Sequence, residues 1–434
     1  MRERLERFFE FDRLKTSWRT ETLAGVTTFV TMAYIIFVNP AILHDAGMPV
    51  GAVTAATCLC AGVATILMGI IARYPIALAP GMGLNAYFAY TVVKGMGIPW
   101  QTALGAVFFS GVVFLLLTLA GLRQRIIRAI PTSLFAAVAT GIGIFIALIG
   151  LRNSGIIVPS AATMVALGNL RAPSALLALF GLALTAVLLA RRVPAAMLIG
   201  IAGTSALGWA TGQVHWQASS SGIGSLAETA FKLDLHALFQ LGLLEIVFVF
   251  VFVDLFDNLG TLIAVTRKAG LMTDAGEIPR VGKILMTDAI ATMLGGLVGT
   301  STVTSYVESA AGIVAGGRSG FTAVVTGSLF LLSLAVVPVA GLIPQAATAP
   351  ALILVGSLMM SHAAEVRWQS FEDSIPAFLT IVTIPLTFSI ATGLSFGFIA
   401  AALLRVVRGD LRKEDWLLYV LALLCLARFV YLNA

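Results

Sequence analysis

Apolar residues run through this chain in stretches of helix-spanning length, separated by short polar segments. A transmembrane helix needs about 20 consecutive apolar residues, or fewer where the helix is interrupted or shielded by protein. The pattern predicts fourteen spans, at 22–41, 50–71, 76–94, 101–121, 133–150, 173–190, 194–211, 238–264, 284–299, 302–316, 321–342, 348–363, 375–391 and 393–407. We therefore expect an all-α polytopic membrane protein.

Composition agrees with this pattern. Of the 434 residues, 59% are hydrophobic and 11% are charged, whereas soluble domains contain roughly 25% charged residues. No segment has the character of a soluble domain. A last apolar segment, 409–434, fits either a fifteenth span or an interfacial helix, and the sequence leaves both open.

Basic residues indicate the orientation, because cytoplasmic connections collect Lys and Arg. With an amphipathic arm at 1–21 on the cytoplasmic side, most of the 27 Lys and Arg residues fall on that side. The exceptions in outer loops are Lys94, Arg152, Arg171 and Lys232, and Arg428 lies within the last apolar run. We expect a multi-pass protein of the cytoplasmic (inner) cell membrane, embedded in the lipid bilayer, with its N-terminus inside. The net charge of +6 follows from this orientation and indicates no nucleic-acid partner.

Two predicted spans are short, contain helix-breaking residues and carry a polar residue at mid-span. They are 75–90, PIALAPGMGLNAYFAY, with Asn85, and 295–313, GGLVGTSTVTSYVESAAGI, with Glu308. Where Gly83 and its neighbours loosen the helix, backbone N–H and C=O groups are freed. Such groups persist at membrane depth only if they are buried in protein or line a cavity.

These interrupted spans are the third and the tenth. They take matching places in two halves of seven spans, 22–236 and 237–408. Because seven is odd, the halves must be inverted in the membrane. Paired interrupted spans in an inverted repeat indicate a transporter's binding site near the midplane.

A polar stripe follows a very apolar run in FVDLFDNLGTL, residues 252–262. At about 100° per residue, Asp254, Asp257, Asn258 and Thr261 fall on one face of a helix. Carboxylates inside a bilayer are costly, by at least about 2.5 kcal/mol each, and usually mark a substrate or ion pathway. The alternative is structural: one or both Asp residues, Glu308 or Asn85 could brace neighbouring helices.

Enzyme chemistry finds little support in the sequence. GMGLNA at 81–86 matches a dinucleotide-binding pattern, but a transmembrane segment cannot supply the strand, turn and helix that this pattern requires. An intramembrane aspartyl hydrolase needs paired carboxylates on different helices, whereas Asp254 and Asp257 share one. The four histidines and three cysteines form no metal-binding pattern. We expect no catalytic residues, no metal and no cofactor.

Four segments together resemble a known family, the azaguanine-type purine permeases of nucleobase:cation symporter family 2. They are TETLAGVTTFVTMAYIIFVNPAIL at 20–43, APGMGLNAYFAY, FVDLFDNLGTL and GTSTVTSYVESAAGI, and their order is that of the family. The resemblance implies a seven-plus-seven inverted repeat with short extended strands in the third and tenth spans. It also implies a core domain of spans 1–4 and 8–11, a gate domain of spans 5–7 and 12–14, and, by analogy, a homodimer.

The resemblance implies a site formed by the third, eighth and tenth spans. The candidate substrate-binding residues are Asn85, Gly83, Asp254, Asp257, Glu308 and Ser309. Asp257 best matches the family's eighth-span Glu, and Asp254 shares its stripe, so the direct ligand stays open between them.

The chemistry of these residues suits a purine nucleobase. A carboxylate accepts hydrogen bonds from ring N–H groups, and charge-assisted bonds are roughly twice as strong as neutral ones. Burial disfavours the charged form of a carboxyl group, so Glu308, Asp254 or Asp257 could take up a proton near neutral pH. We expect proton-coupled import of hypoxanthine, guanine or adenine by alternating access. Uracil, xanthine or another small solute on the same fold is the alternative, and Na⁺ coupling stays open.

Overall fold

The computed structural model describes residues 2–121, 131–213, 222–236, 241–273, 278–409 and 416–431. The α-helices are α1 (Arg2–Phe8), α2 (Phe11–Leu14), α3 (Trp18–Met32), α4 (Ile35–His44), α5 (Val50–Leu67), α6 (Met82–Ala86), α7 (Trp100–Leu119), α9 (Thr132–Asn153), α10 (Pro173–Ala190), α11 (Ala196–Ala210), α12 (Leu241–Ala269), α13 (Val281–Val298), α14 (Ser309–Val314), α15 (Gly320–Leu332), α16 (Val337–Ala340), α17 (Gln345–Met359), α18 (Phe371–Thr387), α19 (Ile390–Arg408) and α20 (Trp416–Tyr431). Two π-helical segments, η1 (Met68–Ala72) and η2 (Tyr87–Gly95), continue α5 and α6, and 3-10 turns occupy η3 (Ile223–Glu228), η5 (Ser333–Val336) and η6 (Met360–Glu365). The strands are β1 (Leu78–Pro80), β2 (Ile157–Ser160), β3 (Met164–Leu167) and β4 (Val303–Ser305).

Local sequence sets the ends of many helices. The Ser17, Ser319 and Ser389 side chains accept backbone N–H groups in the first turns of α3, α15 and α19, which satisfies donors that a helix start leaves free. Gly299 ends α13 with a φ of 100°, a left-handed conformation that Gly adopts without steric cost.

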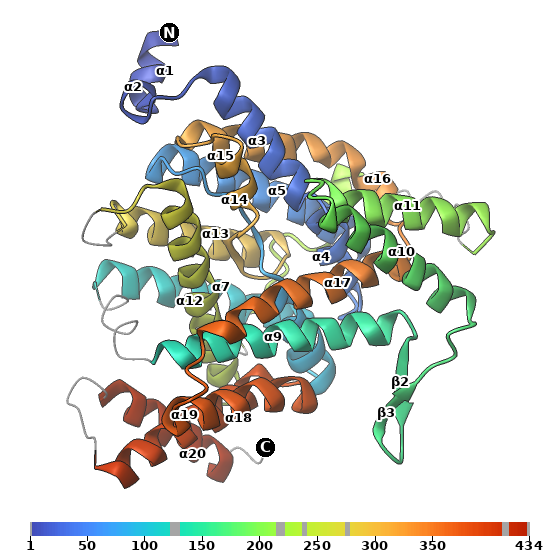
Figure 1. Cartoon of the computed structure of the whole chain (residues 1–434), viewed down its shortest axis with the longest axis vertical. Helices are drawn as coiled ribbons and strands as arrows, with labels where there is room; N and C mark the ends of the chain where they lie inside the picture. The colour runs from blue at the N-terminus through green and yellow to red at the C-terminus, as the bar shows by residue number, and fades with distance from the viewer. Residues whose placement is uncertain are drawn as a thin grey trace.

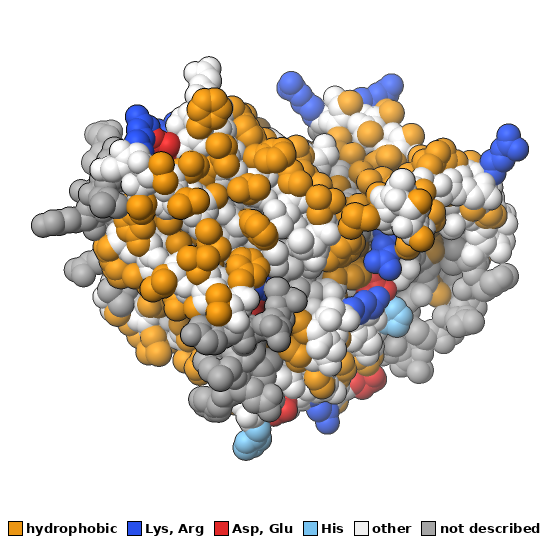
Figure 2. Space-filling view, turned by 90° about the horizontal axis from the view of Figure 1, so that it is seen from below, with side chains coloured by type: hydrophobic (Ala, Val, Ile, Leu, Met, Phe, Trp, Pro, Cys, Tyr) orange, Lys and Arg blue, Asp and Glu red, His pale blue; other side chains and the backbone are white. Residues whose placement is uncertain are grey.

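Ten helical segments of the described chain are long and apolar enough to cross a membrane. In Figure 1, α5, α7, α9, α11 and α18 run in roughly the same direction across the molecule, and the β2–β3 hairpin projects from one end. The protein is thus a mostly helical, multi-pass membrane protein. Figure 2 shows broad areas of hydrophobic side chains on one face, as expected where helices meet lipid.

Four of the fourteen predicted spans are not among these ten segments. The third and tenth are broken into strands and short helices, and the seventh, α11, has only 15 residues. The thirteenth, α18, has 17 residues, with Glu372 and Asp373 in its first turn. Several helices end a few residues away from the predicted span bounds: α12 extends to Ala269, beyond 264, and α18 ends at Thr387, before 391, where Phe388 adopts a left-handed conformation.

The predicted extended strands in the third and tenth spans are present. β1 and β4 pair antiparallel, with Leu78 opposite Ser305, Ala79 opposite Thr304 and Pro80 opposite Val303. All six residues are buried. This pair joins two segments that lie far apart in the sequence.

The helices pack in two groups, named here group A and group B. Group A contains α3, α4, α5, α7, α12, α13, α14 and α15, which pack mainly on one another. Group B contains α9, α10, α11, α17, α18 and α19, which likewise pack on one another. Contacts between the groups are fewer, and include α4 against α17 and α12 against α9.

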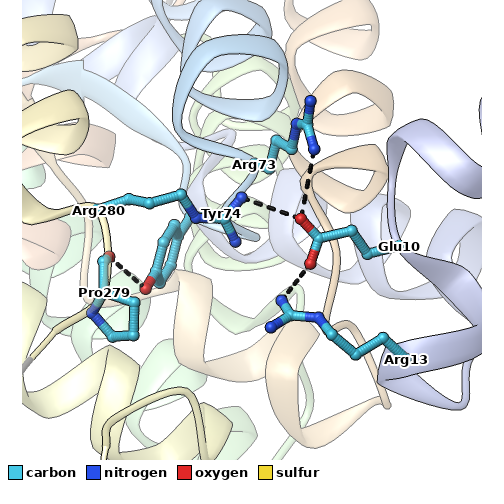
Figure 3. A network of polar contacts seen from close by, with 6 residues as sticks. All are labelled: Glu10, Arg13, Arg73, Tyr74, Pro279 and Arg280. Carbon is cyan, nitrogen blue, oxygen red and sulfur yellow. Dashed lines mark hydrogen bonds and ion pairs between the residues drawn. The ribbon is translucent and has the colours of Figure 1, made fainter.

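The N-terminal arm packs on the protein. The rings of Phe9 and Phe11, 6% and 4% exposed, contact Phe321 at the start of α15. In Figure 3, the Glu10 carboxylate forms ion pairs with Arg13, with Arg73 at 3.3 Å and with Arg280 at 3.1 Å. The Phe9 and Phe11 rings of the arm therefore pack on protein.

The C-terminal apolar segment forms α20, which packs against α19. Its residues Leu417 and Leu421 line an apolar cavity together with five residues of α12, namely Val247, Phe248, Val251, Phe252 and Leu255. α20 therefore lies beside the middle of α12.

Candidate substrate site

The predicted site residues gather around the β1–β4 pair, where the two interrupted spans meet. The breaks in the third and tenth spans free backbone N–H and C=O groups. Several of these groups form hydrogen bonds between the two strand segments. The N–H of Gly81 donates to the carbonyl of Thr302 at 3.0 Å, and the N–H of Tyr306 donates to that of Ala77 at 2.9 Å. The strands therefore form a fixed frame, and side chains carry most of the free hydrogen-bonding capacity.

Asp257 faces this frame. An atom added at the Cβ position of Gly81 would lie 3.0 Å from Thr304 Cγ2, 3.8 Å from Asp257 Oδ2 and 3.9 Å from Thr302 Oγ1. The Thr302 and Thr304 hydroxyls are buried and have no hydrogen-bond partner among the described residues. A buried polar group without a partner is costly, so these two hydroxyls, with the Asp257 carboxylate near the same Gly81 position as Thr302, point to a ligand.

Asp254 lies one turn away and has different surroundings. It is 2% exposed, and its Oδ2 accepts a hydrogen bond from Thr292 Oγ1 of α13 at 3.4 Å. Thr292 also donates to the carbonyl of Val303 in β4, at 3.1 Å. Asp254 thus connects α12 to the scaffold behind the strands, whereas Asp257 lies at their front.

Glu308 precedes α14 on the other side of the strand pair. It is half-buried, and its Oε1 accepts a hydrogen bond from the Tyr34 hydroxyl at 2.6 Å. Tyr306 interacts electrostatically with both Glu308 and Asp257, which brings the two carboxylates into one polar region. The Tyr306 hydroxyl donates to the carbonyl of Pro80 at 2.5 Å, which ties this region to β1.

Asn85 is fully buried behind the strands. Its Nδ2 donates to Asn39 Oδ1 at 2.6 Å, and its Oδ1 accepts from the Ser301 hydroxyl. Asn39 in turn donates to Thr57 at 2.7 Å and to Thr300 at 2.9 Å. The described contacts of Asn85 are those of a residue that joins α4, α6 and the segment before β4.

Ser309 and Gly83 also make structural contacts. The Ser309 hydroxyl accepts a hydrogen bond from the backbone N–H of Ala77 at 3.0 Å, which fixes the chain entering β1. A Cβ at Gly83 would lie only 2.5 Å from Ile142 Cγ2 of α9. Gly83 therefore allows α6, beside the site, to pass close to a group B helix.

Sequence reasoning did not assign roles to Tyr34, Tyr306 or Asn39. Tyr34 and Asn39 lie in segment 20–43, and the resemblance of that segment to the family was the sequence feature that could have indicated a role for them. Tyr306 lies in the tenth span. Tyr34 and Tyr306 have partners 274 and 226 positions away, and Asn39 contacts Thr300, 261 positions away, besides the nearer Thr57 and Asn85.

The chain as a whole is similar in sequence to known proteins. Residues 19–396 match the model of the family described as "Permease family". The chain is 54% identical to a permease of Methanocaldococcus jannaschii over 99% of both chains. It is 45% identical to the adenine permease AdeP of Escherichia coli, covering 99% of this chain and 97% of that one. It is 44% identical to the guanine/hypoxanthine permease PbuG of Bacillus subtilis, covering 99% of this chain and 100% of that one.

Solved structures show the same fold at low sequence identity. The transmembrane domain of the cyanobacterial bicarbonate transporter BicA superposes with a TM-score of 0.65 at 17% identity, over 86% of this chain and 97% of that one. Murine Slc26a9, an anion transporter solved in its inward-facing state, superposes with a TM-score of 0.68 at 10% identity. The match covers 91% of this chain and 69% of that one. The architecture is therefore one that solute transporters use.

Proposed function

Because this chain belongs to the Permease family, nucleobase:cation symporter family 2, we propose that it imports purine nucleobases across the cell membrane. It is a transporter and not an enzyme. Relatives that match it over nearly their whole length are named adenine and guanine/hypoxanthine permeases. The substrates we propose are adenine, guanine and hypoxanthine.

One observation carries the proposal at the level of chemistry. Asp257 Oδ2 and the unpartnered Thr302 hydroxyl lie 3.8 and 3.9 Å from the Cβ position of Gly81, next to the strand pair. A purine presents ring N–H donors next to a carbonyl or ring nitrogen acceptor. The carboxylate would accept hydrogen bonds from the ring N–H groups, and a hydroxyl would donate a hydrogen bond to the carbonyl or ring nitrogen. In this proposal Asp257 and Glu308 contact the purine, while Asp254, Asn85, Ser309 and Gly83 shape the site.

We further propose fourteen spans in a seven-plus-seven inverted repeat, with the N-terminus in the cytoplasm and a homodimeric assembly. Group A, with the strand pair, corresponds to the core domain of spans 1–4 and 8–11. Group B corresponds to the gate domain of spans 5–7 and 12–14. The sparse contacts between the groups support movement of one group past the other during alternating access.

Proton coupling completes the proposal. The Glu308 carboxylate can hold a proton or accept a hydrogen bond, and the Tyr34 hydroxyl at 2.6 Å stabilises its charged form. Protonation would remove one negative charge from a region that also contains Asp257. We propose that this neutralisation allows the loaded group A to move through the apolar interior, where an uncompensated charge is costly.

The test is uptake of labelled adenine, hypoxanthine and guanine by proteoliposomes with an imposed proton gradient. We expect accumulation against the purine gradient, its loss when a protonophore is added, and competition by purines rather than by uracil. Glu308→Gln should bind purine but no longer accumulate it. The matched control is Glu365→Gln, since the Glu365 side chain is 67% exposed.

Two results would count against the proposal. Full gradient-driven accumulation by Glu308→Gln would remove the coupling role. Competition by uracil alone would assign the site to the other nucleobase class.

A further inference from the structure

Arg428 and Glu245 form a buried ion pair outside the residues of the substrate site. Arg428 Nε lies 2.5 Å from Glu245 Oε1, and the two side chains are only 15% and 12% exposed. Arg428 also donates from a terminal nitrogen to Ser395 Oγ at 3.3 Å. Ionisable residues at such a depth in apolar helices usually have a functional role.

This pair crosses the boundary between the two helix groups. Glu245 lies in the first turns of α12, a group A helix, and Ser395 lies in α19, a group B helix. α20 packs along α19, where the Phe396 and Phe429 rings lie 5.6 Å apart. Arg428 therefore connects the α19–α20 unit to α12.

α20 and α12 also face each other across an apolar region. Between them lies an apolar cavity of about 380 Å³, lined by residues that include Phe109 and Val113 of α7, Val251 and Leu255 of α12, and Leu417 and Leu421 of α20. α12 and α19 also meet through the Phe252 and Phe398 rings, whose centroids are 5.2 Å apart. An edge-to-face ring contact is weak and tolerates sliding, whereas the ion pair has one defined geometry.

The pair also lies next to the half-helix that leads from the site. Tyr87, in η2, follows Asn85 by two positions and is fully buried. Its ring packs edge-on against Phe250 of α12 at 5.3 Å, and its hydroxyl lies within electrostatic range of Glu245 and Arg428. That hydroxyl has no hydrogen-bond partner within the described part of the chain. A shift of this half-helix would therefore change the surroundings of the ion pair directly.

We propose that the Glu245–Arg428 ion pair is a latch between the two helix groups, closed in the state seen here and opened in each transport cycle. The inference rests on the proposed movement of group A past group B. α20 then acts as the element that carries the latch arginine from the group B side. Glu245 and Arg428 are positioning residues: neither contacts the purine.

Cross-linking tests whether the contact must open. In a background with Cys58, Cys60 and Cys425 replaced by Ala, Glu245→Cys and Arg428→Cys are combined and bridged with Hg²⁺. We expect the bridged protein to bind labelled purine with unchanged affinity but to lose at least about ten-fold in transport rate, equivalent to about 1.4 kcal/mol in barrier height. Excess thiol should restore transport. The matched control, Phe396→Cys with Phe429→Cys, bridges α19 to α20 within one unit and should transport normally when bridged.

Charge reversal provides a second, independent measurement. Glu245→Arg or Arg428→Glu alone places like charges together and should reduce transport strongly, because an unpaired buried charge is unfavourable. The double reversal restores an ion pair and should recover most of the transport rate, with the same purine affinity throughout.

The outcomes separate the two proposals. Normal transport by the bridged Glu245→Cys and Arg428→Cys protein would overturn the latch, since the contact would then stay closed through the cycle. A double reversal no better than the single ones would overturn it as well. Absence of purine binding by the unbridged, cysteine-free background would instead contradict the proposed function.

Discussion

Asp257 and Asp254 lie one turn apart on α12, but Asp257 and the Thr302 hydroxyl both lie near the Cβ position of Gly81, whereas Asp254 contacts Thr292 of α13. We expect Asp257→Asn to weaken purine binding by about ten- to a hundred-fold, since a hydrogen bond to a charged group contributes about 1.5–3 kcal/mol. Asp254→Asn should bind purine nearly normally but unfold at a slightly lower temperature, because the amide gives Thr292 a neutral acceptor in place of a charged one. Equilibrium binding and thermal unfolding of the purified proteins measure the two effects. Equal loss of purine affinity in both variants would contradict this division of roles.

The same two residues show what sequence could not resolve. The helical period places both on one stripe, and the stripe is present on α12. Which carboxylate meets substrate depends on where β1 and β4 lie relative to that stripe. The relative position of α12, β1 and β4 depends on tertiary packing, and it cannot be predicted from the sequence pattern of any one of these segments. Tyr34 escaped prediction for the same reason: its partner Glu308 is 274 positions away.

At the scale of elements, α6 and α9 approach each other most closely at Gly83. A Cβ there would lie 2.5 Å from Ile142 Cγ2. We expect Gly83→Ala to reduce the purine transport rate by about ten-fold. The added methyl group would clash with Ile142, so that α6 either shifts away from the β1–β4 pair or can no longer move along α9. Adding Ile142→Ala should recover much of the rate by making space. Initial uptake rates in proteoliposomes provide the measurement.

The control for Gly83 lies on α12. A Cβ at Gly260 would meet nothing within 4 Å, and its φ is not in the left-handed region. Gly260→Ala should therefore transport as the parent protein does. Comparable loss in both variants would indicate that helix flexibility, rather than the α6–α9 contact, explains the effect of Gly83→Ala.

Element prediction succeeded where one helix crosses without interruption and was less successful elsewhere. Spans such as α7 and α9 are continuous apolar helices, so length and hydropathy suffice to find them. The third span reads as one apolar segment, but the structure divides it into β1, α6 and the π-helical η2. Composition indicated an interruption there, and the family resemblance supplied the strand. The π-helical turns had no sequence signal of their own.

At the scale of the whole molecule, the N-terminal arm joins connections from both halves of the chain. Glu10 pairs with Arg73, which precedes β1, and with Arg280, which precedes α13 (Figure 3). We expect Glu10→Gln to lower the free energy of unfolding by about 1 kcal/mol, since these partly exposed pairs are screened by solvent. It should also speed tryptic cleavage at Arg13, Lys15 and Arg19.

Limited proteolysis and thermal unfolding measure both effects. The matched control is Glu3→Gln, an exposed carboxylate on the same arm. Unchanged cleavage of Glu10→Gln relative to Glu3→Gln would show that the aromatic contacts of Phe9 and Phe11 hold the arm without the carboxylate.

The pairing of β1 with β4 has a consequence for biosynthesis. The Tyr306 hydroxyl and the Pro80 carbonyl that it caps are 226 positions apart, so translation at about 5–20 residues per second separates their emergence by tens of seconds. During that interval β1 has already left the ribosome, yet the strand that satisfies its N–H and C=O groups does not exist. Until β4 is synthesised, the nascent third span must therefore remain in contact with water or with other protein, since lipid cannot form hydrogen bonds with its backbone. The proposed substrate site is consequently completed only after β4 has been synthesised, when most of the chain is already made.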